Sequence, residues 1–149
     1  MNLKHIFTIG VLIFSIVIAA VIWDKLFATE LVHLLMNVDF LIDYTVRQPS
    51  FLEEFFYHCV TTCIIYVLFM QLARTKLYTL ALLIFTLFSS TALYFILQAQ
   101  AVRPFHTGAL DFVGWIVIHV IFALLLYLCT KKARKNTYFK KRDKQIMGK

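Results

Sequence analysis

An arginine, a histidine and a carboxylate lie close together in one polar stretch of the chain, QAQAVRPFHTGALD. They are Arg103, His106 and Asp111. Arginine's planar guanidinium binds phosphate or carboxylate through two parallel hydrogen bonds, and histidine can donate to the same anion or exchange a proton. The stretch is therefore a candidate site for an anionic group. The alternative is an ordinary polar hairpin in which Arg103 pairs with Asp111 or with a glutamate elsewhere.

A second set of polar side chains lies inside long apolar runs: His58, His119, Ser89 and Ser90. An ionisable side chain at such a position is a functional hypothesis by default. The serines could line a polar path or allow close packing between helices. The two histidines could ligate haem, and the alternative is a neutral histidine bonded to a neighbouring serine. We expect no cofactor.

The three cysteines, Cys59, Cys63 and Cys129, do not form a metal or disulfide pattern. Cys59 and Cys63 are one helical turn apart, which is poor disulfide geometry, and zinc would need ligands that the spacing does not supply. The sequence also has no GxSxG, HExxH or glycine-rich phosphate loop. We expect buried cysteines and no metal site, and the pattern identifies no catalytic residue.

Four apolar runs position these residues, at about 6–23, 51–73, 77–97 and 112–130. The run 77–97 has no charge and, at about 1.5 Å per residue, crosses a hydrocarbon core of about 30 Å. The chain is 61% hydrophobic with a mean hydropathy of +0.79, well above a soluble domain. We predict an all-α integral membrane four-helix bundle, with one transmembrane domain over residues 1–130.

The segment 26–44 is too often interrupted by charge to span a bilayer. We therefore predict an extra helical segment between the first two spans, either interfacial or re-entrant. Ser50 and Glu53 then form a capping-box pattern after Pro49, which places the start of the second span at residue 51.

Charge is divided unevenly along the 149 residues. Nine basic residues and one acid lie in the tail 131–149, whereas six acids and two bases lie between Asp24 and Glu54. The positive-inside rule places Lys4, the turn at 74–76 and the tail in the cytosol. We predict a multi-pass protein of the cell (inner or cytoplasmic) membrane with both termini cytosolic. The same rule accounts for the basic tail, so we expect no nucleic-acid partner.

The order of these features resembles that of VanZ-type small membrane proteins. The shared plan is an inward N-terminus, a long outer loop, an acid and a histidine entering the second span, a short basic turn, and an arginine and aspartate before the last span. The Arg–Asp spacing is longer here, and Trp115 replaces a small amide residue. The matching residues are Glu54, His58, Gln98 or Gln100, Arg103 and Asp111.

A weaker similarity links the chain to PAP2-type lipid phosphatases. Lys76, the long apolar run and Arg103-Pro104-Phe105 are similar to their first phosphate-binding signature, with a longer Lys–Arg spacing. The PSGH and SR…H…D segments of that family are absent. This resemblance implies binding of a phosphate lipid without the catalytic histidines.

Three functions are open from the sequence. In the first, a non-enzymatic membrane protein binds an anionic lipid or envelope precursor at its outer face through Arg103, His106 and Asp111. In the second, an immunity or exclusion protein recognises a toxin or transfer partner within the membrane. In the third, a membrane enzyme acts on a lipid phosphate, with His106 or His33 and Asp111 as an acid–base pair.

Overall fold

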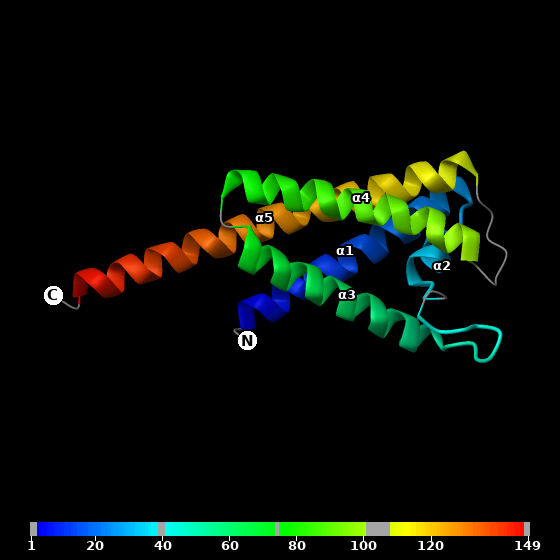
Figure 1. Cartoon of the computed structure of the whole chain (residues 1–149), viewed down its shortest axis with the longest axis horizontal. Helices are drawn as coiled ribbons and strands as arrows, with labels where there is room; N and C mark the ends of the chain where they lie inside the picture. The colour runs from blue at the N-terminus through cyan, green and yellow to red at the C-terminus, as the bar shows by residue number, and fades with distance from the viewer. Residues whose placement is uncertain (1–2, 39–40, 74, 101–107, 148–149) are drawn as a thin grey trace.

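Every regular element in the described part of the chain is a helix. The computed structural model describes residues 3–38, 41–73, 75–100 and 108–147, with side chains to Lys131 except that of Gln100. The helices, in chain order, are α1 (Leu3–Phe27), α2 (Leu31–Met36), α3 (Phe51–Leu72), α4 (Lys76–Gln100) and α5 (Ala109–Met147). The predicted all-α class is confirmed, and so is the extra helix between the first two long helices (Figure 1).

Four of the described helices are long and apolar enough to cross a bilayer. They cover Leu3–Phe27, Phe51–Leu72, Lys76–Ala99 and Ala109–Lys131, which are 22 to 25 residues each. At about 1.5 Å per residue each exceeds the 30 Å of a hydrocarbon core. Their outward faces carry large apolar side chains such as Phe7, Phe14 and Phe88, which lipid solvates and water does not. The protein is therefore a small multi-pass membrane protein.

The long helices alternate in direction (Figure 1). One end of the bundle, which we call the terminal end, holds the N-terminus, the turn between α3 and α4, and the point where α5 leaves the bundle. The other end, called the α2 end, holds α2, the last turns of α1 and α4, and the starts of α3 and α5. The His5 Nδ1 and Tyr66 hydroxyl lie 2.6 Å apart and join α1 to α3 near the terminal end.

Helix α5 packs along both α1 and α4 and forms the centre of the bundle. Its buried face repeats every three or four residues, through Trp115, Ile118, Phe122 and Leu126. Gly114 lets the end of α1 approach this face closely. A Cβ at Gly114 would overlap the Trp23 ring and the Leu31 side chain, so only glycine fits here without rearrangement.

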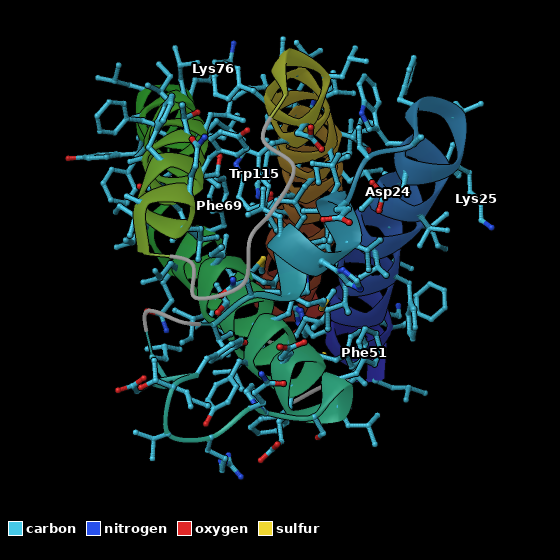
Figure 2. The ribbon with its side chains drawn as sticks, turned by 90° about the vertical axis from the view of Figure 1, so that its right-hand side faces the viewer. Asp24, Lys25, Phe51, Phe69, Lys76 and Trp115 are labelled. Atoms are coloured by element: carbon cyan, nitrogen blue, oxygen red, sulfur yellow. The ribbon has the colours of Figure 1, made fainter. Side chains whose placement is uncertain are left out.

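Asp24, in the last turn of α1, holds the start of α2. Its Oδ1 accepts hydrogen bonds from the Thr29 hydroxyl and the Leu31 N–H, each at 2.7 Å, and its Oδ2 accepts from the Val32 N–H at 2.9 Å. The first N–H groups of a helix have no intrahelical partner, so a carboxylate here satisfies two of them. Figure 2 shows Asp24 turned toward α2 and Lys25 pointing away from the bundle.

Helix α2 is short and packs into the α2 end of the bundle. Four of its six residues are buried, and it contacts α1, α3 and α5. It is shorter than the predicted segment 26–44, because α1 continues to Phe27 and the backbone is extended at Asn37 (ψ 130°). The chain reverses between α1 and α2 at Ala28, whose φ of 54° lies in the left-handed region.

Helix α3 begins where the capping box predicts. The Ser50 hydroxyl accepts from the Glu53 N–H, and the Glu53 carboxylate accepts from the Ser50 N–H at 2.8 Å. From the turn that joins them, α3 and α4 diverge toward the α2 end (Figure 1). Helix α4 packs on α5 instead, so the space between α3 and α4 is only partly filled.

Candidate functional site

A cleft of about 380 Å³ lies between α3 and α4, with α5 as its floor. Binding sites for small molecules range from about 300 to 1,000 Å³. The cleft reaches the bundle surface, because lining residues such as Leu68, Leu72 and Phe85 are 43%, 50% and 66% exposed. Since these helices span the membrane, the cleft opens sideways toward lipid. Its apolar walls include Ile65, Phe69, Leu82, Leu93, Leu97 and Phe122.

Polar side chains form a strip along this apolar cleft. Helical periodicity places the residues at 58, 61 and 62 on one face of α3, and those at 86, 89 and 90 on one face of α4. The strip brings together the four residues predicted as an intramembrane polar site, although α3 and α5 are far apart in sequence. Its members are Asn37, His58, Thr61, Thr62, Thr86, Ser89, Ser90, Trp115 and His119.

His119 and Trp115 form the floor of the cleft. The His119 ring packs on the Trp115 ring at an interplanar angle of 37° with centroids 4.4 Å apart, and His119 Nδ1 lies 2.8 Å from the Trp115 carbonyl oxygen. A carbonyl only accepts, so Nδ1 carries the proton and Nε2 of His119 is an acceptor. The Trp115 indole N–H donates to the Ser90 carbonyl at 2.8 Å and ties α5 to α4. Figure 2 shows Trp115 between these two helices.

His58 lines the cleft, and one of its ring nitrogens is buried beneath the cleft surface. Its Nε2 is buried and has no hydrogen-bond partner. A buried polar atom without a partner costs about 1–3 kcal/mol, so such atoms are uncommon and need an explanation. The predicted bond from a histidine to a neighbouring serine is wrong for His119 Nδ1, whose partner is the backbone carbonyl of Trp115.

Three hydroxyl groups of the strip donate their protons to backbone carbonyls of their own helices. Thr61 donates to the Tyr57 carbonyl at 3.0 Å, and Thr86 donates to the Leu82 carbonyl at 2.8 Å. Ser90 likewise donates to its own helix, to the Leu87 carbonyl at 2.9 Å. Each oxygen keeps lone pairs that can accept. The described lining residues include no lysine, arginine, aspartate or glutamate, so the strip is uncharged by composition. Tyr57 also lines the cleft, and its hydroxyl can donate as well as accept.

Asp111, the described member of the predicted outer site, is buried at the start of α5. Its Oδ2 accepts from the Gly108 N–H at 2.9 Å and its Oδ1 from the Glu30 N–H at 3.5 Å. The carboxylate thus caps α5 and contacts the backbone just before α2. Arg103 and His106 lie outside the described residues, so the anion-binding role of the three residues stays a prediction.

The two glutamates that open α3 have other partners. Glu53 forms an ion pair with Arg47 at 2.8 Å, and the buried Glu54 accepts from the Tyr44 hydroxyl at 2.8 Å. The same Tyr44 hydroxyl accepts from the Val38 N–H at 3.1 Å. These bonds attach the loop after α2 to the first turn of α3.

Other predicted groups are dispersed. The predicted burial of the cysteines is only partial, because Cys59, Cys63 and Cys129 are half-buried thiols outside any disulfide. His33 is exposed on α2 and does not line the cleft. Within the described part of the chain, no group of three or more histidine, cysteine or acidic side chains could hold a metal ion.

The comparisons with known proteins give no family. No protein-family model, curated protein or solved structure matches this chain. The resemblances to VanZ-type proteins and lipid phosphatases therefore stay predictions. The class that the fold defines is a small multi-pass membrane protein with a lateral cleft.

Proposed function

We propose that this is a non-enzymatic membrane protein that binds a lipid or lipid-linked molecule, with its hydrocarbon part in the cleft between α3 and α4. The observation that carries the proposal is the cleft itself, which is apolar, opens sideways at membrane depth and is large enough for part of a chain. Catalysis has no comparable support, because the sequence identifies no nucleophile or acid–base set there.

The distribution of charge supports an orientation in the cell membrane. Lys4, Lys76 and Lys131 are exposed at the terminal end, and the basic tail continues from it. Asp24, Glu30, Asp43 and Glu53 lie toward the α2 end. Under the positive-inside rule the terminal end faces the cytosol and the α2 end faces outward. Cysteine accessibility at Lys4→Cys and Asp43→Cys in intact cells tests this orientation.

Photolabelling tests whether the cleft holds hydrocarbon. The full-length protein is placed in nanodiscs that contain phosphatidylcholine with a diazirine on one acyl chain, and labelled peptides are found by mass spectrometry. Labelling of the cleft residues of α3 and α4 is expected to exceed labelling of the outward face of α1.

Ser89→Phe supplies the matched test, because the new ring would fill the cleft. It should reduce labelling of the cleft peptides about tenfold. Ile84→Phe adds a ring to the same helix at a position that is 59% exposed and does not line the cleft, so it should have no effect. Equal labelling in both variants would contradict the proposal.

An anionic headgroup at Arg103 and His106 is the finer part of the proposal. It is supported by arginine's fit to phosphate oxygens. Arg103→Ala should remove a preference for phosphatidylglycerol over phosphatidylcholine while cleft labelling persists. If the wild-type protein shows no such preference, the headgroup part fails and the cleft part remains.

A further inference from the structure

The hydrogen-bonding groups of the polar strip favour one chemical class of ligand. The inference drawn from them below rests on the proposed function. The strip combines one unpartnered buried nitrogen, His58 Nε2, with several hydroxyl oxygens whose protons are already donated to their own helices. It lies within membrane spans, where water does not readily satisfy such groups. A bound molecule with a complementary polar group would remove the cost of leaving His58 without a partner.

We infer that the cleft binds an amphiphile through an uncharged hydroxyl group, held by His58 Nε2 beside the acceptor oxygens of α3 and α4. A hydroxyl can both donate and accept, so it satisfies His58 Nε2 in either tautomer. When it accepts from His58, its own proton remains available to a threonine or serine oxygen. The chemical class is a long-chain or prenyl alcohol, or a lipid with a free hydroxyl on its backbone.

Two other classes of head group, anions and ether or ester oxygens, would make fewer favourable hydrogen bonds with the strip. A carboxylate or phosphate only accepts when ionised, and it would bring a charge into a cleft whose described lining includes no lysine or arginine. An ether or ester oxygen also only accepts, so it leaves the acceptor oxygens of the strip without a donor. A hydroxyl is a small group that can bond to His58 Nε2 and also donate a hydrogen bond to a threonine or serine oxygen.

Competition among three single-chain probes tests the inference. The full-length protein in nanodiscs is photolabelled with a diazirine-bearing hexadecanol, and unlabelled hexadecanol, hexadecyl methyl ether or hexadecanoate is added as competitor. The three competitors share a sixteen-carbon chain and differ at the head. Hexadecanol should compete about tenfold better than the ether, the factor expected for about one additional buried hydrogen bond.

Substitution at His58 connects this preference to one atom. His58→Leu should bring the two competitors to within about twofold, whereas His58→Gln, which keeps a polar group near the Nε2 position, should restore part of the difference. His33→Leu removes an exposed histidine that does not line the cleft and should leave the preference intact. The ring nitrogens provide a second measurement. In ¹⁵N-histidine NMR of the wild-type protein, hexadecanol should shift the His58 signals and leave those of His33 unchanged.

The outcomes separate this inference from the proposed function. If the three competitors are equal and Ser89→Phe still abolishes labelling, the cleft binds hydrocarbon and the hydroxyl inference is wrong. Tighter competition by hexadecanoate would replace the hydroxyl with an anion as the recognised group. If Ser89→Phe has no effect on any probe, the proposed function itself fails.

Discussion

The buried carboxylates at the α2 end of the bundle and the polar side chains of the cleft differ in their hydrogen-bond partners. At the α2 end, Asp24, Asp111 and Glu54 each accept hydrogen bonds from groups in neighbouring segments. In the cleft, His58 Nε2 is buried without a partner, and the Thr61 and Thr86 hydroxyls donate to carbonyls of their own helices. The carboxylates of the α2 end hold neighbouring segments in position, whereas His58 belongs to a cleft that a ligand can enter. Trp23 Nε1, the other unpartnered buried atom among the described residues, packs against Gly114 and does not line the cleft.

The largest expected effect comes from the packing between α1 and α5. Gly114→Leu places a side chain where even a Cβ would overlap Trp23 and Leu31. Overpacking typically costs about 1–3 kcal/mol and occasionally more, so this variant should show the largest fall in melting temperature in detergent. Gly10→Leu is the control, because a Cβ there meets no atom within 4 Å. Equal stability of the two variants would show that the α1–α5 contact is looser than described.

Removal of the Asp24 carboxylate should come next. Asp24→Ala leaves the Leu31 and Val32 N–H groups without their acceptor, and loss of a helix cap costs about 0.5–2 kcal/mol. The apparent melting temperature should fall by several degrees. Asp43→Ala removes an exposed carboxylate of the following loop and is expected to change little. If Asp24→Ala melts like the wild type, α2 is held by its apolar residues alone.

The indole bond between α4 and α5 should contribute less. Trp115→Phe keeps a ring beside Tyr94 and His119 but loses the hydrogen bond to the Ser90 carbonyl. Hydrogen bonds between membrane helices average about 0.6 kcal/mol and reach about 1.7 kcal/mol. A drop within that range is expected in thermal unfolding followed by Trp23 fluorescence. A larger drop would make the floor of the cleft part of the structural framework.

Two substitutions should stabilise the protein slightly. Ala28→Gly relieves the left-handed backbone at φ 54° and should add about 0.5–1 kcal/mol. His58→Leu removes an unpartnered buried nitrogen and should be neutral or stabilising in the absence of ligand. Thermal unfolding of the delipidated protein measures both. Clear destabilisation by His58→Leu would mean that His58 belongs to the framework and not to a binding site.

The pH dependence of the exposed loop gives the smallest effect. Hydrogen bonds from the Thr45 hydroxyl and N–H to Asp43 hold the pKa of that carboxyl below its usual value near 3.8. A lowered pKa in the folded state stabilises the loop above the ordinary pKa, and the effect is lost as pH falls through the folded value. NMR titration of Asp43 in wild type and in Thr45→Val measures it. An unchanged pKa in Thr45→Val would contradict the Thr45 bonds.

Much of the fold could be predicted from the sequence because membrane helices are encoded locally. Length, hydropathy and the Ser50–Glu53 pair are sufficient to place the membrane-spanning parts of the long helices to within a few residues, although α5 continues as a helix beyond the predicted span to Met147. The length of α2 could not be predicted, because Asp24 caps it across the turn at Ala28. That bond depends on a left-handed residue, which the sequence gives no reason to expect at an alanine.

The polar residues of the cleft could be found singly but not as a set. His58, His119, Ser89 and Ser90 stand out as polar residues within apolar runs. Their meeting depends on the register of α3, α4 and α5, which no local pattern specifies. Thr61, Thr62 and Thr86 also line the cleft, and the prediction did not include them. Each lies three or four residues from His58, Ser89 or Ser90, so listing the residues on the same helical face would have found them.

Helix α5 carries the floor of the cleft and continues without a break to Met147. The part beyond Lys131 is sixteen residues long, a rod of about 24 Å. The end of α5 lies about 45 Å from Trp115 and His119 at about 1.5 Å per residue, so a tilt of about 10° at these residues would move it by about 8 Å. A ligand that tilted α5 within the cleft would therefore also move a segment that lies outside the bilayer.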